Sequence, residues 1–111
     1  MLLQSILKNY RIFIAVQAVD FRKGINGLST LCQPIFEREP CEQHIFVFRN
    51  KRSKACKILF YEKQGFWLCM KRLSHGKFLW WPKSKAHTYF QCELKQLEDI
   101  LFNHMPSELS H

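Results

Sequence analysis

Short apolar runs joined by brief polar connectors place the strongest limit on how this chain folds. Such runs occupy residues 44–49, 57–62, 66–73 and 78–81, and they are rich in β-branched and aromatic side chains. The connectors contain Asn50, Gly65 and Gly76, residue types that favour tight turns. We expect Gly65 to supply the positive φ of its turn. The pattern predicts an antiparallel meander of about four strands.

The segment before the meander predicts a strand followed by a helix. Residues 12–19 are apolar and β-branched, which is typical of a buried strand. Asp20 follows and is a suitable helix cap. Apolar residues then recur at helical spacing, which predicts a helix over about 21–33 that ends or kinks at Pro34. These residues are Ile25, Leu28, Cys32 and Ile35.

A second helix closes the chain. Leu94, Leu97 and Leu101, with Ile100 beside them, predict a helix over about 92–103, and residues 88–90 predict one more short strand before it. We therefore expect an α+β fold, with an N-terminal strand and helix, the meander and a C-terminal helix. A length of 111 residues indicates a single domain, with an ordered core of about 10–103 and a frayed tail at 104–111.

Positive charge is concentrated in one segment. The chain has a net charge of +8, yet residues 49–85 hold eleven Lys and Arg residues and one acid, Glu62. Concentrated cations attract phosphates and release counterions, so a polyanion is a natural partner. The alternative is a solvated surface that keeps the protein soluble.

Seven sequence blocks, taken in order, carry a family resemblance. They are Asp20 to Leu28, Ile45 to Arg52, Lys57 to Leu59, Gln64-Gly65, Lys71 to Leu73, Gly76 to Phe78 and Trp81-Pro82. With these blocks in this order, the chain resembles the small TnpB accessory protein (Orf2-like) of the IS-sixty-six family of bacterial insertion sequences, over about residues 12–103. The resemblance implies a protein that assists transposition by a separate, larger DDE transposase encoded in the same element.

Cations near two predicted structural junctions are the first candidate binding groups. Arg22 and Lys23 are expected in the first turn of the first helix, where they would face the positive end of the helix dipole unless a phosphate sits there. The alternative is that Asp20 caps the helix and pairs locally with one of them. Arg49, Lys51, Arg52 and Lys54 surround the first turn of the meander and should be exposed.

Further cations and one aromatic side chain extend this candidate surface. Lys71 and Arg72 are neighbours on one strand and must point to opposite faces, so at most one belongs to a flat binding face. Of Trp80 and Trp81, one is expected in the core, and the other could stack on an unpaired base beside Lys77 and Lys83, unless both are buried. The predicted nucleic-acid-binding residues are Arg22, Lys23, Arg49, Lys51, Arg52, Lys54, Lys57, Lys71, Arg72, Lys77 and Trp80.

The sequence predicts neither a metal site nor an independent catalytic activity. Cys41 and His44 have the spacing of half a zinc site, but no second close pair follows. The five cysteines are expected to be free thiols. Nine acidic residues show no spaced carboxylate set of the kind that two-metal catalysis needs. We expect no cofactor.

The preferred functional hypothesis is a small basic DNA-binding module. Its expected partners are DNA, at the ends of the element, and the cognate DDE transposase. The alternative is a protein–protein adaptor that docks on the transposase without specific DNA recognition. No apolar stretch approaches the ~20 residues that span a bilayer, and we expect a cytoplasmic protein. The sequence leaves the oligomeric state open.

Overall fold

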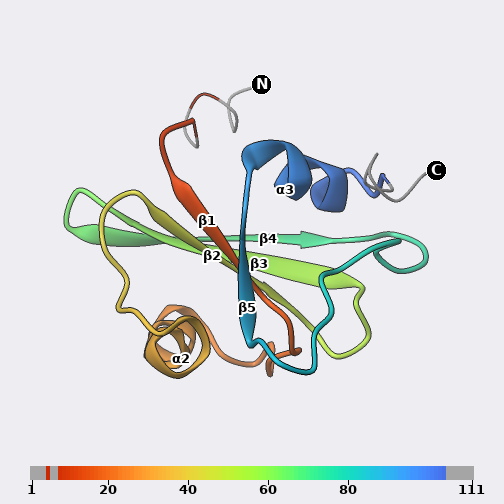
Figure 1. Cartoon of the computed structure of the whole chain (residues 1–111), viewed down its shortest axis with the longest axis horizontal. Coiled ribbons are helices and arrows are strands. Elements are labelled where there is room, and N and C mark those ends of the chain that lie inside the picture. Colours follow the sequence, from red (N-terminus) through yellow and green to blue (C-terminus); the bar gives the residue numbers. More distant parts are fainter. Residues whose placement is uncertain (1–4, 6–7, 105–111) are drawn as a thin grey trace.

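A mixed β-sheet forms the centre of the computed structural model, which describes Ser5 and residues 8–104. One helix lies on each face of the sheet (Figure 1), and the α+β class is confirmed. Residues 105–111 of the predicted tail at 104–111 lie outside the described residues. The strands are β1 (Arg11–Ala15), β2 (His44–Arg49), β3 (Ala55–Glu62), β4 (Gly65–Arg72) and β5 (Tyr89–Cys92), in the order β4-β3-β2-β1-β5; the helices are α2 (Ile25–Phe36) and α3 (Leu94–Leu101).

The connection between β1 and β2 makes the sheet mixed. These two strands are parallel, with Ile12 opposite Ile45 and Ile14 opposite Val47. Parallel neighbours need a long crossover, and α2 carries the chain back across one face of the sheet. β5, the short strand expected after the meander, pairs antiparallel with β1 and closes the sheet on that side.

The predicted four-stranded meander has only three strands. β2, β3 and β4 pair antiparallel in sequence order, but residues 78–81 form no strand. The Phe78 N–H donates to the Ser53 carbonyl at 2.8 Å, and the Trp81 indole N–H donates to the Ala15 carbonyl at 2.8 Å. The aromatic run is apolar because it packs Phe78 and Trp81 on the face of the sheet, not because it extends the sheet.

The first helix begins later and ends later than predicted. Its N-cap is Gly24, so Asp20 does not cap it, and it continues through Pro34 to Phe36. Pro34 lies in the last turn, where it removes one helical hydrogen bond. Phe36 meanwhile packs against Phe46 and Phe48, with ring centroids 4.8 and 5.5 Å apart. Burying this aromatic side chain outweighs the missing bond.

The β3–β4 turn and the C-terminal helix also differ from the predictions. Lys63 and Gln64, with φ of 48° and 69°, supply the positive φ values of the β3–β4 turn, and Gly65 does not. The C-terminal helix is shorter than the predicted 92–103. A reciprocal capping box starts it, because the Glu93 and Gln96 side chains each accept a backbone N–H of the other residue.

Each face of the sheet carries its own core. Phe13, Phe46 and Leu59 pack against Leu28 of α2, and Ile14, Val47 and Ile58 lie on the face covered by Leu97 of α3. Leu28 and Leu97 are both fully buried, as their places in the helical stripes predicted. Since both faces are covered, ligands have access mainly to the ends and edges of the sheet. Within the described part of the chain, no helix is long and apolar enough to cross a membrane.

Candidate nucleic-acid interface

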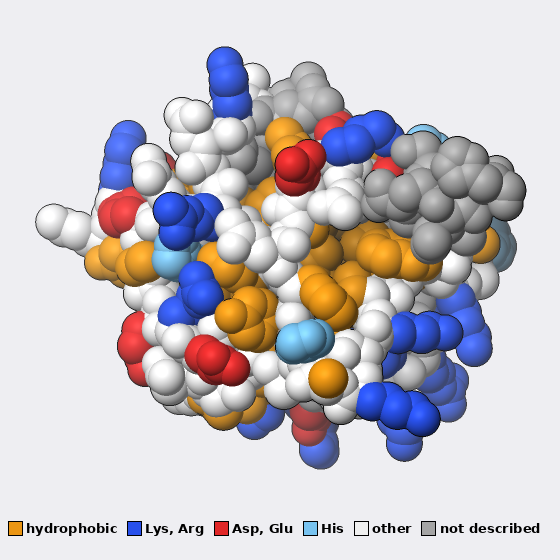
Figure 2. Space-filling view, in the orientation of Figure 1, with side chains coloured by type: hydrophobic (Ala, Val, Ile, Leu, Met, Phe, Trp, Pro, Cys, Tyr) orange, Lys and Arg blue, Asp and Glu red, His pale blue; other side chains and the backbone are white. Residues whose placement is uncertain are grey.

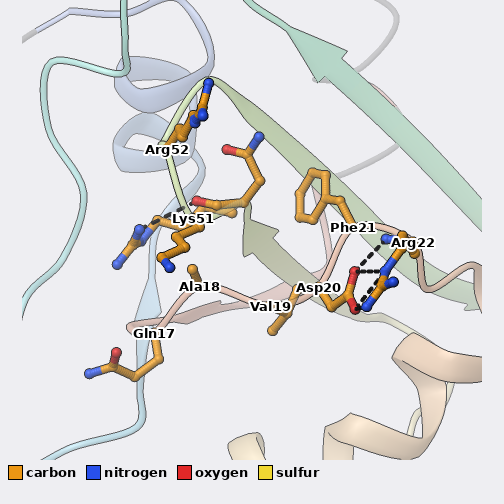
Figure 3. Close-up of a pocket in the computed structure, with 10 residues that line it drawn as sticks. Gln17, Ala18, Val19, Asp20, Phe21, Arg22, Lys51 and Arg52 are labelled. Carbon is orange, nitrogen blue, oxygen red and sulfur yellow. Dashed lines mark hydrogen bonds and ion pairs between the residues drawn. The ribbon is translucent and has the colours of Figure 1, made fainter.

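An open cavity of about 710 Å³ lies at one end of the sheet, between the loop that follows β1 and the turn that joins β2 to β3. Figure 3 shows these segments as its two sides, with Lys51 and Arg52 on one and Asp20 and Arg22 on the other. Residues 17–22 and 49–52 line the cavity. The fold therefore joins two of the predicted candidate segments, which lie about thirty residues apart in sequence.

Lys57 lies beneath the loop that follows β1 and, with Arg49, forms what we call the floor of this loop. The residue is only 8% exposed, and its ammonium donates to the carbonyls of Phe21 and Lys23 at 2.9 and 2.8 Å. The same nitrogen lies 4.9 Å from the centre of the Phe21 ring, a favourable cation–π contact. Lys57 was predicted as a surface contact for nucleic acid, and that prediction is wrong, because the protein's own backbone uses the charge.

Arg49 joins the loop to the turn and is half-buried. Its guanidinium donates to the Val16 carbonyl at 3.3 Å and to the Ser53 hydroxyl at 3.2 Å. Its own carbonyl accepts the Val19 N–H at 3.0 Å. Arg49 was expected to be an exposed member of the turn. Instead, Arg49 is half-buried and connects the loop to the turn through these hydrogen bonds, and part of its surface lines the cavity.

Arg22 and Asp20 form a local pair on the opposite side of the cavity. The guanidinium donates to both carboxylate oxygens, with Nη2 2.7 Å from Oδ2, and the Arg22 N–H donates to Oδ1 at 2.9 Å. This bonding lowers the pKa of Asp20 to about 2. The local pair is the alternative that the sequence left open. The placement in a first helical turn is wrong, since both Arg22 and Lys23 precede α2.

Lys23 contributes its backbone and stem to this loop. Its N–H donates to the Asp20 carbonyl at 3.1 Å, and its side chain packs against the start of α2. A Cβ on Gly27 would lie 2.9 Å from the Lys23 Cβ, so a glycine lets the loop approach the helix closely. The contact gives Gly27 a packing role inside the helix, although Asn26-Gly27 is normally a turn signal.

The β2–β3 turn carries cations that are exposed and not engaged by other described residues. Asn50 shapes it, because its side-chain carbonyl accepts the N–H groups of Lys54 and Ala55 at 2.9 and 3.2 Å. Lys51, Arg52 and Lys54 are exposed, as predicted. No described residue engages these three side chains by a hydrogen bond or ion pair. Their full charge therefore faces solvent.

A second depression, of about 520 Å³, lies on the other side of the same turn. Ser53, Lys77, Trp80 and Lys83 are among the residues that line it. Trp81 is buried and Trp80 is half-buried against the core, so Trp80 offers part of its ring to this depression. Figure 2 shows Lys and Arg side chains gathered at the lower right, where Figure 1 places the turn and the connection after β4.

The last two predicted cations, at the end of β4, have different surroundings. Lys71 and Arg72 point to opposite faces, as predicted. The Lys71 ammonium donates to the Leu101 carbonyl and lies 5.4 Å from the centre of the Phe102 ring, so it ties β4 to the end of α3. Arg72 is exposed and lies opposite Ala55, next to the turn.

The structure thus divides the predicted residues into two groups. It gathers Arg22, Lys51, Arg52, Lys77 and Trp80 around one turn, with Lys54 and Arg72 beside them. It assigns Lys23, Lys57, Lys71 and much of Arg49 to internal bonding or packing. The amide of Gln17 was not predicted, and Lys83 was expected only as a neighbour of the exposed tryptophan. Lys83 belongs to the basic segment, but only the folded connection shows that it returns to the turn.

Cys41 and His44 do lie together, with 3.2 Å between Sγ and Nδ1. Among the described residues, no group of three potential metal ligands forms around them or elsewhere. All five cysteines are free thiols, and Cys41 and Cys69 are the exposed ones. Burial raises the pKa of Cys32 and Cys92 to about 12, which makes these two thiols unreactive near neutral pH.

The fold and this end of the sheet define a small module, covered on both faces, with a basic cavity at one end. Comparison with known proteins gives the family. The family model described as IS66 Orf2 like protein matches residues 10–106, and the chain belongs to this insertion-sequence family.

Two curated relatives come from Sinorhizobium fredii (strain NBRC 101917 / NGR234). The uncharacterized protein y4jC is 39% identical over 75 residues, which is 68% of this chain and 64% of the relative. The uncharacterized protein y4hO is 33% identical over 73 residues, which is 66% of this chain and 64% of the relative. The chain thus spans just under two thirds of each relative's length. No solved structure matches it.

Proposed function

We propose that this protein assists transposition of its insertion sequence by binding the DNA backbone at the β2–β3 turn, and that a separate DDE transposase performs the chemistry. The observation that carries the proposal is the convergence of exposed cations from three distant segments on one turn. Arg22 comes from the loop after β1, Lys51 and Arg52 from the turn, and Lys77 and Lys83 from the connection after β4.

The electrostatics of the two depressions support a phosphate ligand. Of the described residues that line them, Asp20 is the single acid, and Arg22 already neutralises it. Arg49 and Lys57 hold the loop and the turn in place, so binding requires little further ordering. Partly exposed Trp80, beside Lys77 and Lys83, offers a stacking surface for a base that leaves the helix.

A titration with a labelled duplex that carries the element's terminal sequence tests the proposal. With about five phosphates neutralised, log K should fall with log[salt] at a slope of roughly −4 to −5. The double variant Lys51→Gln/Arg52→Gln should make this slope shallower by about 2, since each phosphate contact contributes about 0.9.

A matched control removes the same charge from the opposite end of the sheet. Arg11 begins β1 and Lys63 lies in the β3–β4 turn, and both are exposed. Arg11→Gln/Lys63→Gln should keep the parental salt slope. Equal slopes for the two double variants would refute a site at the turn, and a slope near zero for the parent would refute electrostatic binding.

The adaptor hypothesis predicts a different result. A protein that only docks on the transposase would co-purify with it and show the same DNA affinity with and without Lys51 and Arg52. Incubation of the protein alone with the duplex and Mg²⁺ tests the further proposal that it has no catalysis of its own. In that reaction the strands should remain intact.

A further inference from the structure

β4 is an outer strand with one side unpaired. β3 pairs with it along its whole length, and it ends the sheet on that side. In an antiparallel ladder, alternate residues direct their backbone groups toward the neighbouring strand. The Leu73 N–H donates to the Lys54 carbonyl, which shows that the odd-numbered residues face β3. The N–H and C=O groups of Phe66, Leu68, Met70 and Arg72 therefore point outward.

The side chains along this edge are unusually apolar for a strand that faces water. Phe66, Trp67 and Met70 are 36%, 56% and 54% exposed. Natural edge strands are normally short, or interrupted by Pro, a bulge or inward-pointing charges. β4 has eight residues, and its only charged side chains are Lys71 and Arg72 at its last positions. An edge that is uncharged over its first six residues, with free backbone groups and exposed aromatic side chains, favours pairing with another strand.

We infer that β4 pairs antiparallel with β4 of a second copy of this chain, around a two-fold axis at Leu68. A two-fold axis perpendicular to the sheet keeps each side chain on its own face, and an axis at Leu68 sets the outward backbone groups of the two strands opposite each other. Centring the pairing on Leu68 pairs the strand from Gly65 to Lys71 in both copies. Centring it on Met70 would pair only residues 68–72.

The side chains are self-complementary in this register. Phe66 lies opposite the second copy's Met70, and Trp67 opposite its Cys69, so each aromatic ring meets a sulfur-containing side chain. Lys71 lies opposite Gly65, and Arg72 opposite Gln64. This self-match is the reason to assign the edge to a second copy instead of a strand from another protein.

Like charges also select the register. With the axis at Leu68, the two Arg72 positions are about 27 Å apart along the strands. With the axis at Met70 they would be about 14 Å apart, and Lys71 of each copy would approach the other's basic end. Because Arg72 adjoins the β2–β3 turn, the Leu68 register puts the two basic cavities at opposite ends of the shared sheet.

Sedimentation equilibrium over a wide range of protein concentration tests the pairing. The parent should show a reversible monomer–dimer equilibrium. Met70→Pro removes an outward N–H, which an isolated edge strand tolerates, and should weaken the dimer by at least about tenfold. Met70→Ala keeps the N–H and should lose less. Circular dichroism spectra that match the parent would show that the proline variant is folded.

A charge pair tests the register without proline. Phe66→Glu should weaken the dimer, and Phe66→Glu/Met70→Lys should restore it, because the two new side chains face each other only when the axis is at Leu68. A parent that is monomeric at every concentration would overturn the inference. The inference would also fail if the Met70→Pro variant folded and still dimerised like the parent, or if the double variant dimerised no more tightly than Phe66→Glu. Lys51→Gln/Arg52→Gln should dimerise normally, which separates this result from DNA binding.

Discussion

The floor of the loop after β1 and the rim of the basic cavity contain the same residue types in opposite roles. On the floor, Lys57 and Arg49 donate to carbonyls of the loop that follows β1. On the rim, Lys51 and Arg52 project from the turn with their charge exposed. The segments are adjacent in sequence, and nothing in their composition separates them. The difference shows that a net positive charge overstates how many cations are available to a ligand.

Burial explains the division. A lysine directed inward must satisfy its ammonium group with acceptors, and here the backbone of the loop provides them. A lysine on the turn has water on all sides and requires no partner. The floor therefore holds the loop in the shape that the rim needs, and variants on the floor and the rim should affect different measurements.

The largest effect is expected at the floor. Lys57→Met keeps the length of the side chain but removes its hydrogen bonds to the Phe21 and Lys23 carbonyls, and it should destabilise the protein by about 2–3 kcal/mol. Urea unfolding measures this change. Lys54→Met, a change at the exposed turn, is the control and should stay within about 0.5 kcal/mol of the parent. Equal stability for both variants would remove the distinction between floor and rim.

Arg49 should give an intermediate result. Arg49→Gln loses the bonds to Val16 and Ser53, which are long at 3.3 and 3.2 Å, and should cost about 1 kcal/mol. Arg52→Gln, with the same change of charge on the rim, should leave the urea midpoint unchanged but weaken DNA binding. A stability loss for Arg52→Gln as large as that for Arg49→Gln would show that the turn is a structural unit.

The Asp20–Arg22 pair sharpens the comparison, because Arg22 belongs to the rim but is already paired. Asp20→Asn removes the negative charge from the cavity and releases the guanidinium. Affinity for duplex DNA at low salt should rise about two- to fivefold. Fluorescence anisotropy with the labelled duplex measures this rise. Unchanged affinity would indicate that Arg22 lies outside the DNA contact.

The pH dependence of this pair is the smallest expected effect. Because the Arg22 guanidinium lowers the pKa of Asp20 to about 2, the ionised pair stabilises the folded loop above the ordinary pKa of an aspartate. That contribution should fade only as the pH falls toward 2. Carboxyl-detected NMR should find Asp20 ionised at pH 3, where exposed carboxylates are already protonated. Titration near pH 4 would mean that the pair does not persist in solution.

The sequence by itself determined the element types and the location of charge. Short apolar runs rich in β-branched and aromatic residues indicate β2, β3 and β4, and the helical stripes through Leu28 and Leu97 define the buried faces of α2 and α3, because these patterns depend on local backbone geometry. The resemblance of the motif series also identified the family. The turn at 50–54 was predictable for the same local reason, since Asn50 forms it within a few residues.

Only the tertiary structure decided which residues meet. Pro34 remains helical because Phe36 packs against β2, and residues 78–81 lie on the sheet face because Trp81 reaches the Ala15 carbonyl. Arg22 lies near the β2–β3 turn, and Lys57 donates to the carbonyls of the loop, because the fold brings together residues about thirty positions apart. Such contacts arise from packing across strands, and sequence periodicity describes only the face that a residue occupies, not the group that it touches there.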